Sequence, residues 1–177
     1  MQRRPATIRR ATVSDATAIA TVHVSSWQDA YRGLLPQDFL DGLDVGRRRD
    51  GWERILAEAD WPRTATLVVD SDEGVVGFAH LCPTRDDDGD PATVGEIVAI
   101  YLLSRLWSTG VGRRLMDESL DVLGTAGFRE ATLWVLDTNE RARRFYESGG
   151  WPADGTAKED RWGDVVLNEV RYRRPIA

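Results

Sequence analysis

The chain has 177 residues, a formal net charge of −6 and a pI near 5. This length suits one ordinary domain, 1–177, which can bury a sizeable core without disulfides or a structural metal. The acidic balance argues against a broad nucleic-acid surface, although a local basic patch could still hold an anion. The positive charge is almost all arginine, since Lys158 is the sole lysine, and arginine suits bidentate phosphate contacts.

Cysteine, histidine and hydropathy patterns exclude several classes of protein. Cys82 is the only cysteine, so no intramolecular disulfide is expected. His23 and His80 have no second ligand at a metal-binding spacing, so we expect ordinary structural or surface histidines and no metal. The basic amino terminus is followed by no apolar segment of signal length, and no segment is apolar enough to cross a bilayer. We therefore expect a soluble, cytoplasmic protein without a membrane partner.

The first half of the chain predicts a short strand, a helical block and a β-hairpin. The strand covers 7–11, and Ser14 is expected to cap a helix that ends before Tyr31. Pro36 should begin a short second helix, and Asp44 should cap a third. The hairpin joins strands at 64–69 and 75–81 through the turn-forming segment 70–74. The acidic segment 83–91 is expected to be a surface loop.

The stretch 96–116 reads EIVAIYLLSRLWSTGVGRRLM and predicts a strand, a glycine loop and a helix. Its apolar run suits a buried strand, and apolar residues after Gly112 recur at helical spacing. The first turn of a helix leaves backbone N–H groups unpaired and partly positive, so a diphosphate-bearing ligand is one hypothesis. The alternative is that the glycines only make a tight turn. The dinucleotide fingerprint is excluded because Leu115 replaces its third glycine, and no Gly-Lys-Ser/Thr triphosphate motif follows.

The rest of the chain predicts a second strand parallel to the central one. A strand at 131–136 follows the helix, and strand-helix-strand of this length implies a right-handed crossover. Asn139 should cap a helix at 140–148 that Gly149 and Gly150 end. The segment 151–164 is expected to be turn-rich, and 165–173 to form a closing strand.

Several separated pieces together resemble one family. The segment IYLLSRLWSTGVGRRLM resembles the acetyl-CoA-binding motif of the GNAT N-acetyltransferase superfamily, in which a strand feeds a Q/R-x-x-G-x-G/A loop. Residues 139–151 resemble its N-x-x-A-x-x-F-Y-x-x-x-G-F/W segment, 169–174 its last strand, and 8–36 a bacterial branch. The resemblance implies an α/β fold, with a central mixed twisted sheet of about six or seven strands flanked by helices. A central parallel strand pair would form the acetyl-CoA cleft.

The chain departs from the motif at one place. Trp107 stands where the family has Gln or Arg, and Ser108 replaces the following glycine. Because most hydrogen bonds to the diphosphate come from backbone N–H groups, we expect binding to survive. Arg105, Arg113 or Arg114 could supply the missing charge, or all three could be ordinary surface arginines.

The resemblance also implies an acetyl-CoA-dependent N-acetyltransferase in which a primary amine attacks the thioester directly. The implied roles are Tyr146 as the acid that protonates the leaving thiolate and Glu96 as the base, although a charged residue at a strand end is often merely solvated. Trp27 and Tyr31 line the amine pocket or belong to the core. The implied cofactor-binding residues are Ile100, Tyr101, Leu102, Trp107, Ser108, Thr109, Gly110, Val111, Gly112, Arg113 and Asn139.

The partners stay open at the level of the sequence. The acceptor could be a small-molecule, protein or peptide amine, and dimerisation is common in the family. A non-catalytic acyl-CoA-binding sensor with the same fold is the main alternative. A nucleotide-dependent protein that uses the glycine loop for another diphosphate is a third reading, which the failed nucleotide motifs disfavour.

Overall fold

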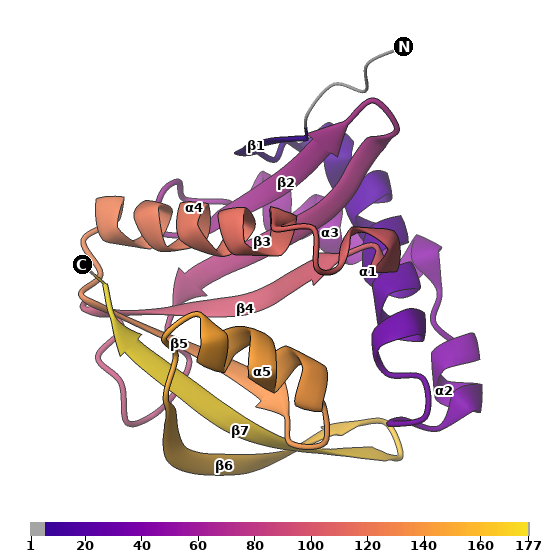
Figure 1. The fold of residues 1–177 in the computed structure, drawn as a ribbon. Coiled ribbons are helices and arrows are strands. Elements are labelled where there is room, and N and C mark those ends of the chain that lie inside the picture. Colours follow the sequence, from indigo (N-terminus) through magenta and orange to yellow (C-terminus); the bar gives the residue numbers. More distant parts are fainter. Residues whose placement is uncertain (1–5, 177) are drawn as a thin grey trace.

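A computed structural model describes residues 6–176, which form one seven-stranded sheet with helices on both faces (Figure 1). The strand order is β1-β2-β3-β4-β5-β7-β6, and every neighbouring pair is antiparallel except β4 and β5, which are parallel. The strands are β1 Thr7–Arg10, β2 Ala65–Ser71, β3 Gly74–Pro83, β4 Val94–Leu102, β5 Glu130–Leu136, β6 Ala153–Trp162 and β7 Val165–Pro175. The predicted mixed α/β sheet with a central parallel pair is therefore confirmed.

The helices cover the two faces of the sheet because its strands alternate their side chains between them. Within β2, Leu67 and Val69 pack into a cluster with residues of α4 and α5, whereas Val68 packs into a cluster with α1 and α3. Figure 1 shows α4 and α5 in front of the sheet. The helices are α1 Ala16–Ala30, α2 Gln37–Asp41, α3 Val45–Ala57, α4 Val111–Thr125 and α5 Glu140–Ser148, with short 3₁₀ turns η1 Val13–Asp15 and η2 Ser104–Leu106.

The two parallel strands separate shortly after they meet. Their register covers three positions, from Val94 opposite Glu130 to Glu96 opposite Thr132. A bulge in the pairing of β4 with β3 follows, because Ile97 lies opposite Leu81 whereas Ala99 lies opposite His80. Beyond this point the β5-facing edge of β4 is no longer paired with β5, so its backbone groups can bond to something else.

Two predicted helix starts differ from the structure. Ser14 is not the cap: Thr12 and Asp15 form a capping box around η1, and α1 begins after Asp15. The Asp15 carboxylate accepts from Thr12 N at 2.8 Å and is bound by Arg9 of β1, which favours this start over one at Ser14. Pro36 precedes α2 with an extended ψ of 133° instead of forming its first residue. The predicted cap Asp44 is confirmed, since its side chain accepts from Arg47 N.

The prediction of a turn-rich 151–164 is wrong. This segment contains β6, which pairs antiparallel with β7 from Ala153 opposite Tyr172 to Trp162 opposite Val165. Most residues of β6 are exposed, and Gly155 at φ +86° lies where the register shifts. An edge strand with water on most of its surface lacks the apolar alternation that identifies strands in a sequence.

Candidate active site

One cavity of about 980 Å³ gathers most of the residues proposed from the sequence. It is lined from both faces of the separated strands, by residues of α1, α3, β4, β5, α5 and β7. The lining includes Trp27, Tyr31, Glu96, Ile100, Tyr101, Leu102, Trp107, Ser108, Gly110, Gly112, Arg113, Asn139 and Tyr146. Thr109 and Val111 do not line it, and the Thr109 hydroxyl donates to Leu106 O at 2.7 Å.

At one end of the cavity, the amino terminus of α4 has free backbone donors. No side chain caps it, and the first N–H to bond within the helix is that of Arg114, to Gly110 O at 3.2 Å. Gly110 has a left-handed φ of 87° and Ser108 a φ of 60°, which turns the loop sharply into the helix. A Cβ at Gly112 would lie 3.3 Å from Leu102 Cδ1, so the glycine lets the helix pack against the end of β4. These features form a cradle for an anionic group.

Trp107, the residue that departs from the family motif, carries a stacked arginine. Its indole N–H donates to Leu102 O at 3.1 Å, and the Arg141 guanidinium lies 3.2 Å from the centre of one of its rings. Arg141 lines the cavity, and burial lowers its pKa from the usual value. Sequence reasoning missed Arg141, although it lies two residues after Asn139 within the downstream motif.

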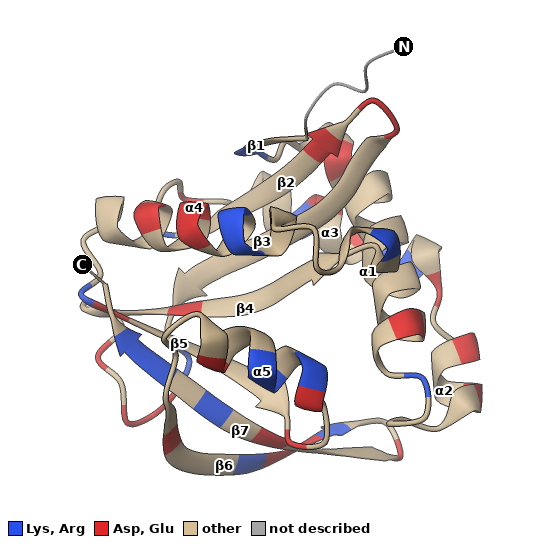
Figure 2. Cartoon of the chain, viewed as in Figure 1, with Lys and Arg blue, Asp and Glu red and all other residues tan. Residues whose placement is uncertain are grey.

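The three arginines proposed to replace the missing charge have other partners. Arg105 pairs with Glu73 at 2.6 Å, and Arg114 donates to Ala6 O at 3.2 Å. Arg113 lines the cavity and donates to Phe145 O and Ser148 Oγ, at 3.3 and 3.1 Å. Figure 2 shows basic residues on α5 and at the start of α4, together with acidic residues on the same two helices.

Tyr146, on α5, lies against the cavity with 8% of its surface exposed. Burial raises its pKa well above the usual value for a phenol, so the hydroxyl keeps its proton at neutral pH. Two further phenols line the cavity, those of Tyr31 and Tyr101, whose hydroxyls are 3.1 Å apart. Asn139 caps α5 through a bond from Ala142 N at 3.2 Å and also lines the cavity.

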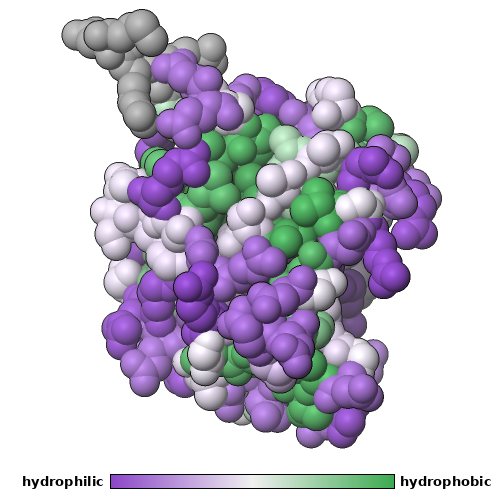
Figure 3. Space-filling view, turned by 90° about the vertical axis from the view of Figure 1, so that its right-hand side faces the viewer, coloured by the Kyte–Doolittle hydropathy of each residue, from purple (hydrophilic) through white to green (hydrophobic). Residues whose placement is uncertain are grey.

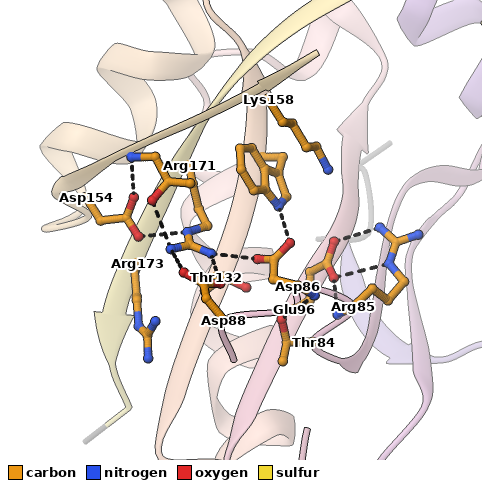
Figure 4. Close-up of polar contacts among 12 residues, drawn as sticks. Thr84, Arg85, Asp86, Asp88, Glu96, Thr132, Asp154, Lys158, Arg171 and Arg173 are labelled. Carbon is orange, nitrogen blue, oxygen red and sulfur yellow. Dashed lines mark hydrogen bonds and ion pairs between the residues drawn. The ribbon is translucent and has the colours of Figure 1, made fainter. Parts of the chain in front are cut away.

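Glu96, the proposed base, is 2% exposed and is bound by one arginine. Its Oε1 accepts from Arg85 Nη2 at 2.7 Å, and its Oε2 accepts from Arg85 Nε and backbone N–H at 3.2 and 3.1 Å (Figure 4). The Arg85 side chain is 61% exposed, so it can leave the carboxylate without unpacking the core. Nothing in the sequence pattern indicated this pair.

The loop that carries Arg85 is fixed to the last two strands by Arg171 of β7 (Figure 4). The Arg171 side chain is 4% exposed and donates to Asp86, Asp88 and Asp154 at 2.6 to 3.1 Å. Trp134 donates to Asp86 at 3.0 Å from β5. The surface loop expected at 83–91 is thus anchored beside the cavity.

A second carboxylate, Glu169 of β7, also lines the cavity. Burial raises its pKa, and its nearest cation is Lys158, 3.7 Å away. A partly buried carboxyl with a raised pKa is a candidate proton acceptor near neutral pH. The sequence showed Glu169 only as part of the last strand.

Trp27 and Tyr31 are packed in an apolar cluster and also line the cavity. The Trp27 ring lies 4.8 Å from Tyr31 and 4.8 Å from Trp162, which comes from the end of β6. Helix α1 and the β6–β7 hairpin therefore meet across this side of the cavity. Figure 3, viewed toward the side of α1 and α2, shows apolar residues gathered between hydrophilic ones.

His23 is a buried, neutral member of the same aromatic group. Burial lowers its pKa to about 3, and Trp52 Nε1 donates to its Nδ1 at 3.1 Å. The ring stacks on Tyr101 with centroids 5.6 Å apart. The prediction of a structural histidine is confirmed, and the structure adds that it lines the cavity. Among residues 6–176, no group of three or more His, Cys, Asp or Glu side chains could hold a metal ion.

Residues 26–151 match the model of the acetyltransferase (GNAT) family. The chain belongs to this family. The uncharacterized N-acetyltransferase YuaI of Bacillus subtilis is 32% identical over 75% of this chain and 73% of its own length. The phosphinothricin N-acetyltransferase of Streptomyces viridochromogenes is 27% identical over 98% of this chain and 92% of its own.

Solved structures show the same GNAT fold. The PaiA N-acetyltransferase of Thermoplasma acidophilum, in complex with coenzyme A, superposes with a TM-score of 0.80 at 17% identity, over 97% of this chain and 99% of that one. YncA of Salmonella typhimurium, a putative acetyltransferase with acetyl-CoA, gives a TM-score of 0.69 at 18% identity, over 98% and 95%. No helix within the described residues is long and apolar enough to span a membrane.

Proposed function

We propose that this GNAT protein transfers the acetyl group of acetyl-CoA to a primary amine of a small molecule or peptide. The observation that carries the proposal is the separation of β4 from β5 beside the uncapped amino terminus of α4. Solved proteins of the same fold contain coenzyme A or acetyl-CoA, which supports this choice of cosubstrate.

The described residues fit a long anionic thioester. The unpaired edge of β4 at Ile100, Tyr101 and Leu102 would bond the amide-rich pantetheine arm. Backbone N–H groups of 108–113 would hold the diphosphate, with Arg113 and Arg141 as nearby cations. Acetyl-CoA supplies the activated acyl group. A β4 backbone N–H near the bulge would polarise its carbonyl oxygen.

The transfer needs three proton movements: two protons leave the nitrogen and one reaches the sulfur. At neutral pH an alkylammonium is unreactive, so Glu96 takes a proton from it, directly or through water, and frees the nitrogen lone pair. The amine then forms the new C–N bond as the C–S bond breaks, so no covalent enzyme intermediate is required. Tyr146 gives its proton to the departing thiolate, and burial keeps that phenol protonated until then. The second nitrogen proton, lost as the amide forms, passes to the phenolate, directly or through water, and restores Tyr146.

The proposal is tested by incubating the purified protein with acetyl-CoA and a panel of amines while a thiol reagent reports released coenzyme A. We expect amine-dependent release with at least one amine class, and mass spectrometry should show the product heavier by one acetyl group. Tight binding of acetyl-CoA without turnover on any amine would instead indicate the sensor alternative. Preferential thermal stabilisation by NAD or ATP would indicate a nucleotide-binding protein.

A further inference from the structure

Arg48 of α3 is a cavity-lining cation that has no acidic partner within the described part of the chain. Its guanidinium carbon lies 4.9 Å from the centroid of the Trp162 ring and 5.5 Å from that of Trp27. Its side chain makes no hydrogen bond or ion pair with any residue of the described 6–176. Burial lowers the pKa of Arg48 but leaves it charged at neutral pH. A partly desolvated charge without a counter-ion is costly, which suggests that one arrives with a ligand.

The groups around Arg48 are hydrogen-bond donors or neutral aromatic rings. Burial raises the pKa of Tyr101, and its neighbours Tyr31 and Trp27 lower it in part. The indole N–H of Trp27 is buried and has no hydrogen-bond partner among the described residues, so it is a free donor. His23 is neutral and accepts from Trp52 at Nδ1, so its Nε2 carries the hydrogen. These neighbours suit an oxyanion, and the acid whose charge also acts on Tyr101 is Glu169.

The acids that line the cavity are already engaged with other partners. Glu96 is bound by Arg85, and Glu169 lies 3.7 Å from Lys158. Asp160 accepts from the backbone N–H of Arg161 at 2.8 Å and from Trp162 Nε1 at 3.3 Å. Among residues 6–176, no acid of the cavity lining is therefore left to pair with Arg48.

We propose that Arg48 binds an oxyanion of the acceptor, so that the substrates are amines that carry a carboxylate or similar anion, of which free amino acids are the simplest class. The inference rests on the proposed acetyl transfer and names its substrate class. A planar guanidinium binds a carboxylate through two parallel hydrogen bonds, which fixes the orientation as well as the position of the acceptor.

The position of Tyr101 indicates a short acceptor. After the larger effect of burial, Tyr101 contributes to the pKa of both Arg48 and Tyr146. The oxyanion site and the proposed acid therefore both lie near one phenol. An acceptor whose amine and anion belong to one small molecule fits this proximity better than a long polyamine does.

The test compares each common amino acid with its carboxamide and its decarboxylated amine, with 2-aminoethylphosphonate as an amine that carries a different oxyanion. The variants are Arg48→Gln, Arg48→Lys and the control Arg49→Gln, an exposed neighbour that pairs with Asp50 outside the cavity lining. For each amino acid, wild type should prefer the carboxylate form over the carboxamide and the decarboxylated amine by about 10- to 100-fold in kcat/KM. This factor corresponds to the usual contribution of a hydrogen bond to a charged group. Arg48→Gln should lose this preference, Arg48→Lys should recover part of it, and Arg49→Gln should keep it.

The result also separates this inference from the proposed function. Acetylation of neutral amines as efficiently as of their anionic counterparts, or an Arg48→Gln variant with the wild-type preference, would overturn the oxyanion site while leaving acetyl transfer intact. If no amine is acetylated, calorimetry with the same amino acids tests the oxyanion site by itself. The site is supported if the wild-type protein binds an amino acid and Arg48→Gln does not. It is overturned if the wild-type protein binds none. Unchanged acetyl-CoA affinity in Arg48→Gln shows that the variant is folded.

Discussion

Replacing Arg171 by Gln should destabilise the protein far more than replacing its neighbour Arg173. Arg171 donates to three carboxylates and to the Thr156 hydroxyl while its side chain is 4% exposed. Removing one member of a buried ion pair costs roughly 3–5 kcal/mol, because the partner charge stays desolvated. Asp86 and Asp154 are 13% and 20% exposed and keep that penalty, whereas water screens Asp88 at 58%.

We therefore expect a loss near the lower end of that range, about 3 kcal/mol. For a chain of this size that corresponds to a melting temperature lower by about 6–12 °C. The matched control is Arg173→Gln, whose partner Glu130 is 42% exposed, so that its cost should stay within about 1 kcal/mol. Thermal unfolding followed by circular dichroism at pH 7 measures both variants. Equal melting temperatures for the two variants would refute this account of the loop anchor.

The ion pairs of Arg171 predict a pH dependence of stability. The hydrogen bonds from Arg171 lower the pKa of Asp88. Burial alone would raise the pKa of Asp154, but the hydrogen bonds from Thr156 and Arg171 outweigh it, so that pKa is also lowered. A lowered pKa contributes stability that is present above the unfolded value and is lost as pH falls through the folded one. The difference in melting temperature between wild type and Arg171→Gln should thus be complete at pH 6–8 and shrink below about pH 4. A constant difference across this range would contradict the assignment.

Three further substitutions test the chemistry of the cavity. Tyr146→Phe should lower kcat by about 10²-fold or more while the dissociation constant of acetyl-CoA stays unchanged, and wild-type kcat at saturating substrates would remove Tyr146 as the acid. Glu96→Gln should alter the acidic limb of the plot of kcat/KM against pH and retain the basic limb. If Glu169→Gln alters the acidic limb instead, Glu169 is the base. Arg141→Gln should weaken acetyl-CoA binding about tenfold in calorimetry, whereas Arg105→Gln should not, and equal affinities would show that Arg141 does not contact the phosphates.

Local signals made the central part of the fold predictable. The apolar run before Gly110 and the helical spacing after it reflect a strand buried on both faces and a helix with one buried face. The caps Asp44 and Asn139 were also readable, because a capping bond spans only three residues. Edge strand β6 was missed because its residues face mostly water and its pairing with β7 supplies the order instead.

The cavity was only partly predictable, because distant elements build it. Motif spacing indicated Tyr146 and the glycine loop, which belong to continuous segments of the chain. Arg48 comes from α3 and Glu169 from β7, and only the packing of α1 and α3 against the sheet brings them to one cavity. In the sequence each is one charged residue among many, and no spacing rule connects them.

The central claim is that the parted strands and the free N–H groups of α4 bind acetyl-CoA. Isothermal titration calorimetry of the purified protein with acetyl-CoA tests it most directly. We predict saturable binding of one equivalent per chain, with an affinity that falls when Gly112 is replaced by Val, whose side chain would meet Leu102 and Phe145 at the cradle. No heat of binding across a concentration range that saturates other acetyltransferases, in a protein that unfolds cooperatively, would contradict the account.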